Sequence, residues 1–337
     1  MFLLYISKVK VIFLNYAGEN DLLFEFDDVI MKQEKYPEEL RRLIKSNFEL
    51  MNNEDPICLK NIFSDIDDDF WFWILTEGNQ IDPRIQKKLP LMPEEQIQLN
   101  FTGRCGRDAL TEAFSAYKFF KQLINEHGRE ISKQETILDF GCGWGRIIRF
   151  FLKDLNPQQI FGTDCFREMI DICHSSNMNC NFDVNAPMPP LKYSDNMFDI
   201  IYLYSVFSHL SEEAHLAWLK EFHRILKPGG IFIATTRPIE FIEYCHFLAQ
   251  KKKVSDWERG SKLAFPDPDQ AINDFNKGNY IFSPTGGGGI LDKSFFGECC
   301  IPEQYVKEKW KLFFKEIEYI PASLHNQFDQ TVIVGIK

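Results

Sequence analysis

The chain has 337 residues, 45% of them hydrophobic, and a formal net charge of −11. This length fits one large α/β domain with additions, or two domains, and it leaves enough apolar side chains for a sizeable core. The negative balance disfavours contact with phosphate backbones, so we expect no nucleic-acid partner.

The cysteines and the first residues bear on the compartment. Nine cysteines are present, an odd number, and no two of them form a CxxC pair. In a chain of this size such usage predicts reduced thiols and a cytoplasmic protein. The opening stretch MFLLYISKVKVIFL is interrupted by Lys8 and Lys10, so we expect a strand around 8–13 rather than a secretion signal. No stretch approaches the ~18 apolar residues of a membrane span, and no membrane association is expected.

The first part of the chain has little regular patterning. Residues 1–95 are expected to form an N-terminal extension, followed by a single domain over 96–337. Apolar residues at intervals of three and four predict a helix over 37–51. The same spacing predicts an amphipathic helix over 107–125, close to the start of the main domain.

From residue 136 onward, expected strands and helices alternate. The strands are TILDF, QIFGTD, CNFDVN, FDIIYLYS and IFIATT, and the helices span 147–155, 167–174 and 212–226. This rhythm predicts an α/β fold with a Rossmann-like, doubly wound, mostly parallel sheet. The last apolar segments, LFFKEIEYI and QTVIVGIK, are too close in sequence for a parallel crossover, so the last strand is expected to be antiparallel. Residues 238–300 break the rhythm and predict an insertion after the fifth strand.

The segment ILDFGCGWGR, residues 137–146, has three glycines at every second position directly after an expected strand. Doubly wound sheets bind ligands beyond the carboxyl ends of their strands, so this loop is an expected binding site. A P-loop would end in Lys and Ser or Thr, whereas Arg146 and Ile147 follow here, which excludes that type of site. A dinucleotide loop would place its third glycine at position 146, so NAD binding is disfavoured and stays an alternative.

The same segment closely resembles the first motif of the class I S-adenosylmethionine-dependent methyltransferases, an acid followed by GxGxG. FDIIYLYSVFSHL resembles the fourth-strand segment of that family, RILKPGGIFIATT the following helix, turn and strand, and TVIVGIK its antiparallel seventh strand. The resemblance covers about residues 103–237 and the C-terminal hairpin. It implies a methyltransferase with S-adenosylmethionine as its cofactor.

The resemblance also implies roles for residues at the strand ends. The three glycines would let the backbone approach the methionine part of the cofactor, and Asp139 would orient their loop. Asp164 closes the second strand, where the family has the acid that holds both ribose hydroxyls, and Cys165 would lie beside the adenine.

After the third strand, Asp183 and Asn185 compete for the adenine edge, and spacing favours Asn185 with Ala186. Tyr204 and Ser205, at the end of the fourth strand, would lie near the sulfonium. The implied cofactor set is Asp139, Gly141, Cys142, Gly143, Gly145, Asp164, Cys165, Asn185, Ala186, Tyr204 and Ser205, with Gly103 and Arg104 as further candidates for the cofactor's carboxylate.

Methyl transfer is an in-line displacement at an activated carbon, for which an enzyme supplies alignment and, for some acceptors, a base. His209, just past the fourth strand, is the first candidate base, with a structural role as the alternative. His246 begins the insertion and is a second catalytic candidate. Arg237, at the end of the fifth strand, is suited to hold an acidic acceptor or else to end a helix. The sequence has no paired metal-ligand spacing, so no metal is expected.

The acceptor is the least specified part of the prediction. The fourth strand ends in YSVF and not in the Asn/Asp-Pro-Pro-aromatic sequence that resembles enzymes acting on nucleobase amino groups. We expect methyl transfer to an O or N of a small or medium-sized acceptor, with sugars, glycans and secondary metabolites suggested by analogy. A non-catalytic cofactor-binding module and an NAD-linked oxidoreductase stay open. The insertion, with its run Gly286–Gly289, is expected to cover the substrate as a mobile lid, or else to be a surface turn.

Overall fold

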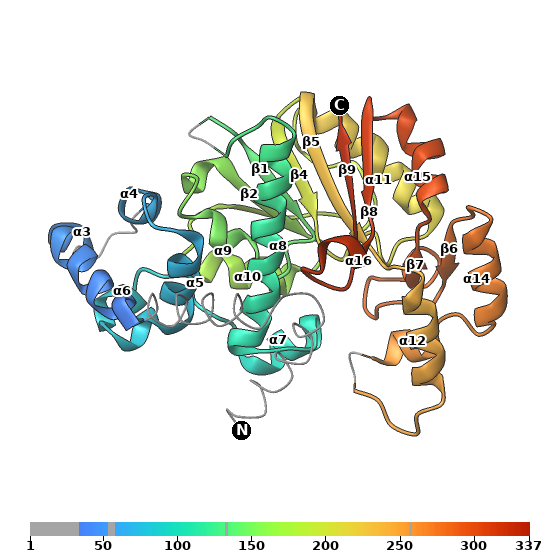
Figure 1. Cartoon of the computed structure of the whole chain (residues 1–337), viewed down its shortest axis with the longest axis horizontal. Coiled ribbons are helices and arrows are strands. Elements are labelled where there is room, and N and C mark those ends of the chain that lie inside the picture. Colours follow the sequence, from blue (N-terminus) through green and yellow to red (C-terminus); the bar gives the residue numbers. More distant parts are fainter. Residues whose placement is uncertain (1–33, 53–57, 132–133, 256–257) are drawn as a thin grey trace, which may run out of the picture. The chain divides into compact units, whose positions relative to one another are not determined.

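The computed structural model describes residues 34–52, 58–131, 134–255 and 258–337 (Figure 1). The strand expected around 8–13 lies outside these residues. The chain divides into two compact units, and each is described here by itself. The first unit holds residues 34–52 together with Ile66–Lys87. The second unit holds residues 58–65 together with the described residues of Lys88–Lys337.

The first unit is helical. Its elements are a helix over 34–46, α3 (Phe48–Asn52), α5 (Asp68–Glu77), the 3-10 helix Gly78–Gln80 and α6 (Pro83–Gln86). The helix predicted over 37–51 is therefore present, with a turn at Asn47. Asp67 caps α5 by accepting the backbone N–H of Phe70 at 2.7 Å, and the Phe70 ring stacks on Tyr36 with 4.5 Å between centroids. Aromatic packing thus holds this unit together.

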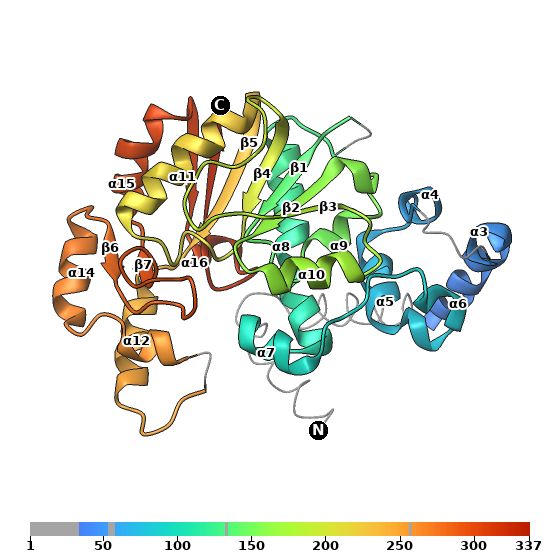
Figure 2. The same cartoon turned by 180° about the vertical axis from the view of Figure 1, so that it is seen from behind.

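The second unit is built on one seven-stranded sheet (Figures 1 and 2). Its strands are β1 (Ile137–Phe140), β2 (Ile160–Asp164), β3 (Asn181–Val184), β4 (Phe198–Leu203), β5 (Leu226–Thr236), β8 (Glu316–Ile320) and β9 (Thr331–Ile336). The order is β3-β2-β1-β4-β5-β9-β8, and β9 runs antiparallel to both of its neighbours. The predicted doubly wound sheet with an antiparallel last strand is confirmed. Its order reverses between β1 and β4, where such sheets open a crevice for ligands.

Helices cover both faces of this sheet. Figure 1 shows α8 (Gly106–Glu126) across one face, and Figure 2 shows α11 (Glu212–Ile225) across the other. The ring of Phe120 on α8 lies 5.5 Å from that of Tyr202, and Trp218 on α11 lies 4.4 Å from Phe140. Ser211 caps α11 by accepting the N–H of Ala214. Outside the insertion, the other helices of the unit are α4 (Lys60–Phe63), α7 (Glu95–Thr102), α9 (Ile148–Phe151), α10 (Arg167–Ser175), α15 (Glu303–Lys309) and α16 (Ala322–His325), with 3-10 helices at Pro157–Gln159 and Trp310–Leu312.

One helix is much shorter than predicted. The sequence predicts a helix over 147–155, but only Ile148–Phe151 is α-helical. Two backbone bonds reach only the third preceding residue, from Phe150 to Ile147 within the helix and from Asp154 to Phe151 after it, where Leu155 also bonds to Phe151. Such tight turns end an α-helix, because its bonds reach the fourth preceding residue.

The insertion after β5 has a structure of its own. It contains α12 (Glu240–Ala249), α13 (Arg259–Leu263), α14 (Pro268–Asn276) and the antiparallel pair β6 (Ile281–Ser283) and β7 (Glu298–Cys300). The glycine run is a hydrogen-bonded turn, in which Gly286 donates to the carbonyl of Phe296 and Gly287 to that of Leu291. Figure 1 shows α12 at the end of the sheet where the parallel strands finish. The mobile lid stays a prediction.

All nine cysteines are free thiols, including the vicinal pair Cys299 and Cys300, both of which are buried. Over the described part of the chain, no helix combines the length and the apolar character that crossing a membrane requires.

Candidate functional site

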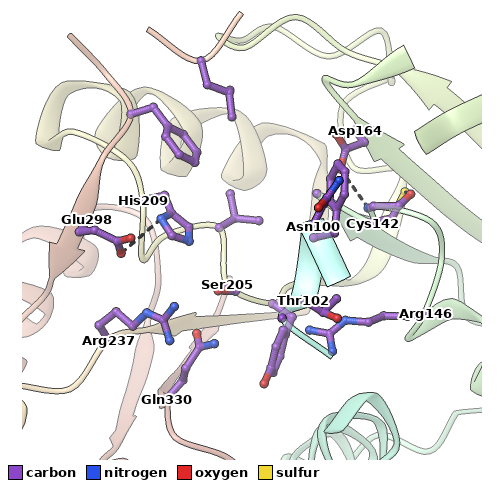
Figure 3. A pocket seen from close by; sticks show the side chains of 18 of the residues that line it. Asn100, Thr102, Cys142, Arg146, Asp164, Ser205, His209, Arg237, Glu298 and Gln330 are labelled. Atoms are coloured by element: carbon purple, nitrogen blue, oxygen red, sulfur yellow. Dashed lines mark hydrogen bonds and ion pairs between the residues drawn. The ribbon is translucent and has the colours of Figure 1, made fainter. Parts of the chain in front are cut away.

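A cavity of about 1050 Å³ opens beyond the carboxyl ends of the central strands (Figure 3). Its walls come from the loops after β1, β2, β4 and β5, from α7 and the start of α8, and from the insertion. This position is the switch point of the sheet order, where the strand connections on either side diverge. The cavity is therefore the candidate site.

The glycine loop forms one wall. Gly141, Gly143 and Gly145 have φ angles of 75°, 52° and 74°, a region that side chains disfavour. A Cβ on Gly141 would lie 2.4 Å from Cγ2 of Val206, and one on Gly145 would lie 2.5 Å from Cε of Met178. A Cβ on Gly143 would meet nothing within 4 Å. Gly141 and Gly145 thus permit close packing, whereas Gly143 exposes bare backbone to the cavity; Gly145 itself is not among the lining residues.

Asp164 joins the end of β2 to this loop. Its Oδ2 accepts the N–H of Gly143 and its Oδ1 accepts that of Phe166, both at 2.9 Å. Burial raises the pKa of this carboxyl, and the two backbone donors oppose the rise. Each carboxylate oxygen has a further lone pair, so Asp164 can still accept two ligand hydroxyls. Cys165, the next residue along the chain, also lines the cavity.

Asp139 lies deeper, at the end of β1, and is 3% exposed. Its Oδ2 accepts the hydroxyl of Tyr202 at 2.9 Å. Burial raises the pKa of Asp139 to about 8, against the lowering effect of the Tyr202 hydrogen bond. The carboxyl is therefore mostly protonated at neutral pH, and a ligand cation beside it would favour its ionised form.

Asp183 and Asn185, the two candidates for the adenine edge, have different surroundings. Asn185 lines the cavity, and its Oδ1 accepts the hydroxyl of Thr163 at 2.8 Å. Asp183 does not line it and is paired instead with Lys192 and with the Tyr193 hydroxyl. Ala186 is exposed and outside the lining, so the expected pair contributes only its first member.

Glu112 on α8 connects several candidates, and sequence reasoning missed it. Its Oε1 accepts from both terminal nitrogens of Arg146 at 3.0 Å and from the Tyr204 hydroxyl at 3.2 Å. Its Oε2 lies 3.3 Å from Nε of Arg104. Glu112 thereby fixes three lining side chains from three separate segments. The sequence around Glu112 gives no signal for these contacts, because the partners are distant along the chain.

Ser205, directly after β4, has a φ of 61°, which is unusual for a residue other than glycine. Its N–H donates to Oγ1 of Thr235 at 2.7 Å, and the Thr235 hydroxyl donates to Oε1 of Gln330 at 2.7 Å. This chain links the ends of β4, β5 and β9 beneath the cavity. Gln330 was not identified from the sequence.

His209 has a defined tautomer. Its Nδ1 lies 2.9 Å from the carbonyl oxygen of Gly297, and because a carbonyl only accepts, Nδ1 carries the proton. The ring stacks on Phe296, and Oε2 of Glu298 lies 3.5 Å from Nδ1. Burial lowers the pKa of His209; Glu298 opposes this shift, and the charge of Arg237 adds to it. The imidazole is neutral near pH 7, with the lone pair on Nε2, so it can accept a proton.

Of the other two predicted catalytic residues, Arg237 lines the cavity and His246 does not. Arg237 lines the cavity at the end of β5, 5% exposed, with its guanidinium 4.4 Å from the centre of the Phe241 ring. His246 is exposed on α12, lies 3.0 Å from the side chain of Gln250 and is not among the lining residues. Its position therefore gives no support to a catalytic role. Across the residues that the structure describes, no group of His, Cys, Asp and Glu is arranged to hold a metal ion.

Comparison with known proteins points to one class. Residues 137–230 match the family model of a methyltransferase domain. The chain is 31% identical over 111 residues to an uncharacterized methyltransferase of Schizosaccharomyces pombe, which covers 30% of this chain and 39% of that protein. It is 25% identical over 194 residues to phosphoethanolamine N-methyltransferase 3 of Arabidopsis thaliana, covering 57% and 34%.

Among solved structures, an S-adenosylmethionine-dependent methyltransferase from Mesorhizobium loti shares 13% identity over 64% of this chain and 96% of that one, with a TM-score of 0.41. The chain spans well under half the length of the Schizosaccharomyces and Arabidopsis relatives.

Proposed function

We propose that this chain, whose residues 137–230 form a class I S-adenosylmethionine-dependent methyltransferase domain, is an enzyme that methylates an oxygen or nitrogen atom of a small or medium-sized acceptor. One observation carries the proposal. Gly143, whose N–H donates to Asp164, lines the same cavity as His209, whose Nδ1 bonds to Gly297 and whose Nε2 is left to accept a proton. A cofactor cradle and a candidate base thus share one enclosed space.

The residues present fit the cofactor. Gly143 leaves room where any side chain would project, and Asp164 retains acceptor capacity for ribose hydroxyls. Asp139 would face the amino group, and Asn185 would reach the adenine edge. Two residues implied by the resemblance, Gly145 and Ala186, do not line the cavity and would not contact the cofactor. Gly145 would act indirectly, because it lets the loop pack on Met178. When bound, S-adenosylmethionine supplies a methyl group on a positively charged sulfur.

His209 supplies the base. Its Nε2 takes the proton of the acceptor's O–H or N–H while the freed electron pair forms the bond to the methyl carbon. The bound cofactor would supply the methyl group, and the electron pair of its carbon–sulfur bond would stay on sulfur. The imidazolium that forms is stabilised by Glu298 and by the carbonyl of Gly297, which both lie at Nδ1. The insertion residues Phe296 and Glu298 line the cavity, in keeping with residues 238–300 as the acceptor cover.

The two alternatives are less well supported. A dinucleotide-binding oxidoreductase would not need GxGxG spacing, and the family match favours the methyltransferase. A non-catalytic binding module would not need a buried imidazole with one nitrogen fixed and the other open. A small acceptor also agrees with the name of the Arabidopsis relative, a phosphoethanolamine N-methyltransferase, and sugars, glycans and secondary metabolites are the first compounds to screen.

Calorimetric titration tests the cofactor assignment. S-adenosylmethionine and its demethylated product should each bind at one site, and NAD should bind far more weakly. Asp164→Asn should weaken binding about tenfold or more, since hydrogen bonds to a charged group contribute roughly 1.5–3 kcal/mol each. Asp183→Asn, which removes an acid outside the cavity, is the matched control and should leave affinity unchanged. Tight NAD binding, or no effect of Asp164→Asn, would contradict the assignment.

A further inference from the structure

We propose that Arg237 and Gln330 bind a carboxylate group of the methyl acceptor, so that the acceptor is an organic acid. This inference rests on the proposed methyltransferase function and names the substrate class of the same cavity.

Arg237 is a buried cation that packs on the Phe241 ring and has no acidic partner among the described residues. Among the described residues its guanidinium makes no ion pair or hydrogen bond, and its Nε is fully buried. Glu298 on β7 also lines the cavity, but its Oε1 accepts the Ser261 hydroxyl, and its Oε2, which has no hydrogen-bond partner, lies 3.5 Å from Nδ1 of His209 and not in an ion pair with Arg237. A buried charge is costly unless it is paired, and a guanidinium matches a carboxylate with two parallel hydrogen bonds.

A helix end does not explain Arg237. It lies just before α12, which begins at Glu240. The amino end of a helix carries partial positive charge, so it favours an anion and disfavours a guanidinium. The helix and Arg237 therefore both favour a negative group at this end of β5.

Gln330 adds a second donor. It is 3% exposed, and its Oε1 accepts the hydroxyl of Thr235, which in turn accepts the Ser205 N–H. In this arrangement the Thr235 oxygen receives the Ser205 proton and gives its own to Oε1, which turns the Nε2 group of Gln330 away from Thr235. The Nε2 group is left without a partner among the described residues. A donor pair with no acceptor on the protein predicts an acceptor on the ligand.

The two donors are neighbours across the sheet. The last paired residues of β5 and β9 are Thr236 and Thr331, and Arg237 and Gln330 are the next position along this antiparallel ladder. Figure 3 shows both side chains directed into the same part of the cavity, away from Asp164. Most of the implied cofactor residues lie at the ends of β1, β2 and β3, with Tyr204 and Ser205 after β4, whereas this pair follows β5 and precedes β9. His209, after β4, lies between the two groups in sheet order.

Charge selects a carboxylate rather than a phosphate. Glu240, Glu258 and Glu298 line the same cavity as Arg237. These acids repel a dianion more strongly than a monoanion, so the one guanidinium suits the single charge of a carboxylate better than the two charges of a phosphate monoester. The anchored carboxylate would leave a separate O–H or N–H of the acceptor for His209.

Ligand binding in matched series tests the proposal. The full chain, saturated with the demethylated cofactor, is titrated with hydroxybenzoates, the corresponding hydroxybenzamides and hydroxyphenyl phosphates, which differ in one group. We expect the best carboxylate to bind about tenfold or more tightly than its amide, and Arg237→Met to abolish that preference. Gln330→Leu should reduce it. Arg42→Met, which removes an exposed cation of the first unit, should leave it unchanged.

Three results would overturn the inference: no carboxylate binding more tightly than its amide, a preference that survives Arg237→Met, or phosphates binding more tightly than carboxylates. Failure of the proposed function looks different. In that case the cofactor itself does not bind, while the same titrations in its absence still report on Arg237.

Discussion

Nδ1 of His209 lies 2.9 Å from the carbonyl oxygen of Gly297, so a residue that follows β4 is oriented by a residue of the insertion. The contact is reciprocal, since the N–H of Gly297 donates to the carbonyl of His209 at 2.8 Å. The backbone N–H of Cys299 likewise donates to the carbonyl of Ser208 at 2.8 Å. The segment that lines the acceptor side of the cavity therefore also sets the tautomer of the candidate base.

Replacement of His209 should remove catalysis and spare cofactor binding. We expect His209→Gln to lower kcat by about 10²–10⁴-fold, the usual contribution of a general base. Affinity for S-adenosylmethionine should change little, because His209 is not among the groups that face the cofactor. His246→Gln, at the exposed histidine of α12, is the control and should retain full activity. Equal losses in both variants would contradict the assignment.

The activity should depend on pH through the same imidazole. Burial holds the pKa of His209 below its ordinary 6.5, and only the neutral ring can accept a proton at Nε2. The rate should therefore fall as the pH drops through that lowered pKa and be constant above it. Glu298 raises this pKa, so Glu298→Gln should move the acid limb to still lower pH. An acid limb centred above 6.5, or one that moves upward in Glu298→Gln, would be inconsistent with this role. The measurement is kcat/KM between about pH 5 and pH 8.

Cofactor binding should release a proton from Asp139. Its pKa of about 8 leaves the carboxyl mostly protonated at pH 7, and a bound cation favours the charged form. Calorimetric binding enthalpies at pH 7 should therefore vary with the ionisation enthalpy of the buffer, with a slope approaching one proton. Asp139→Asn should abolish the dependence. A zero slope in the unaltered protein at pH 7 would show that Asp139 is already ionised.

Asp139 should also affect stability in a fixed direction. Its folded-state pKa lies above the unfolded value of 3.8, so the folded protein binds the extra proton between these values. The contribution of this group to the free energy of unfolding is full below about pH 4 and is lost as the pH rises toward 8. Denaturant unfolding of Asp139→Asn and of the unaltered protein between about pH 4 and pH 8 measures this effect. The free energy of unfolding of the unaltered protein should fall with rising pH relative to that of Asp139→Asn.

Two glycines of one loop should respond differently to alanine. At Gly141 a Cβ would meet Cγ2 of the stiff Val206 side chain, so Gly141→Ala should lower the melting temperature of the free protein markedly. At Gly143 the space is open, so Gly143→Ala should cost only the backbone strain of roughly 1–2 kcal/mol. Its methyl group should instead weaken binding of the demethylated product about tenfold or more. Unchanged affinity in Gly143→Ala would place the cofactor elsewhere.

The fold and the position of the glycine loop were predictable because their signals are local. Buried strands read as apolar runs, and the glycine spacing follows directly on one of them. The short α9 was not predictable, because apolar residues continue past Phe151 while the backbone tightens into turns. Apolar periodicity alone does not distinguish these arrangements.

The acceptor side was predicted only in part because its contacts are distant in sequence. Glu112 binds Arg146 across 34 positions, and Gly297 binds His209 across 88. Neither Glu112 nor Gln330 belongs to a recognisable motif. His246 was expected in the site because it begins the insertion, but it falls on the exposed side of α12. Helix phase relative to a cavity depends on tertiary packing, which local sequence does not specify.

Transfer of label from methyl-labelled S-adenosylmethionine to small organic acids that carry a hydroxyl or an amine tests the central claim most directly. The account predicts label in an acceptor and an equal amount of demethylated cofactor, with both lost in His209→Gln although the cofactor still binds. Tight cofactor binding without any transfer by the unaltered protein, across acidic and neutral acceptors alike, would contradict it and identify a binding module instead.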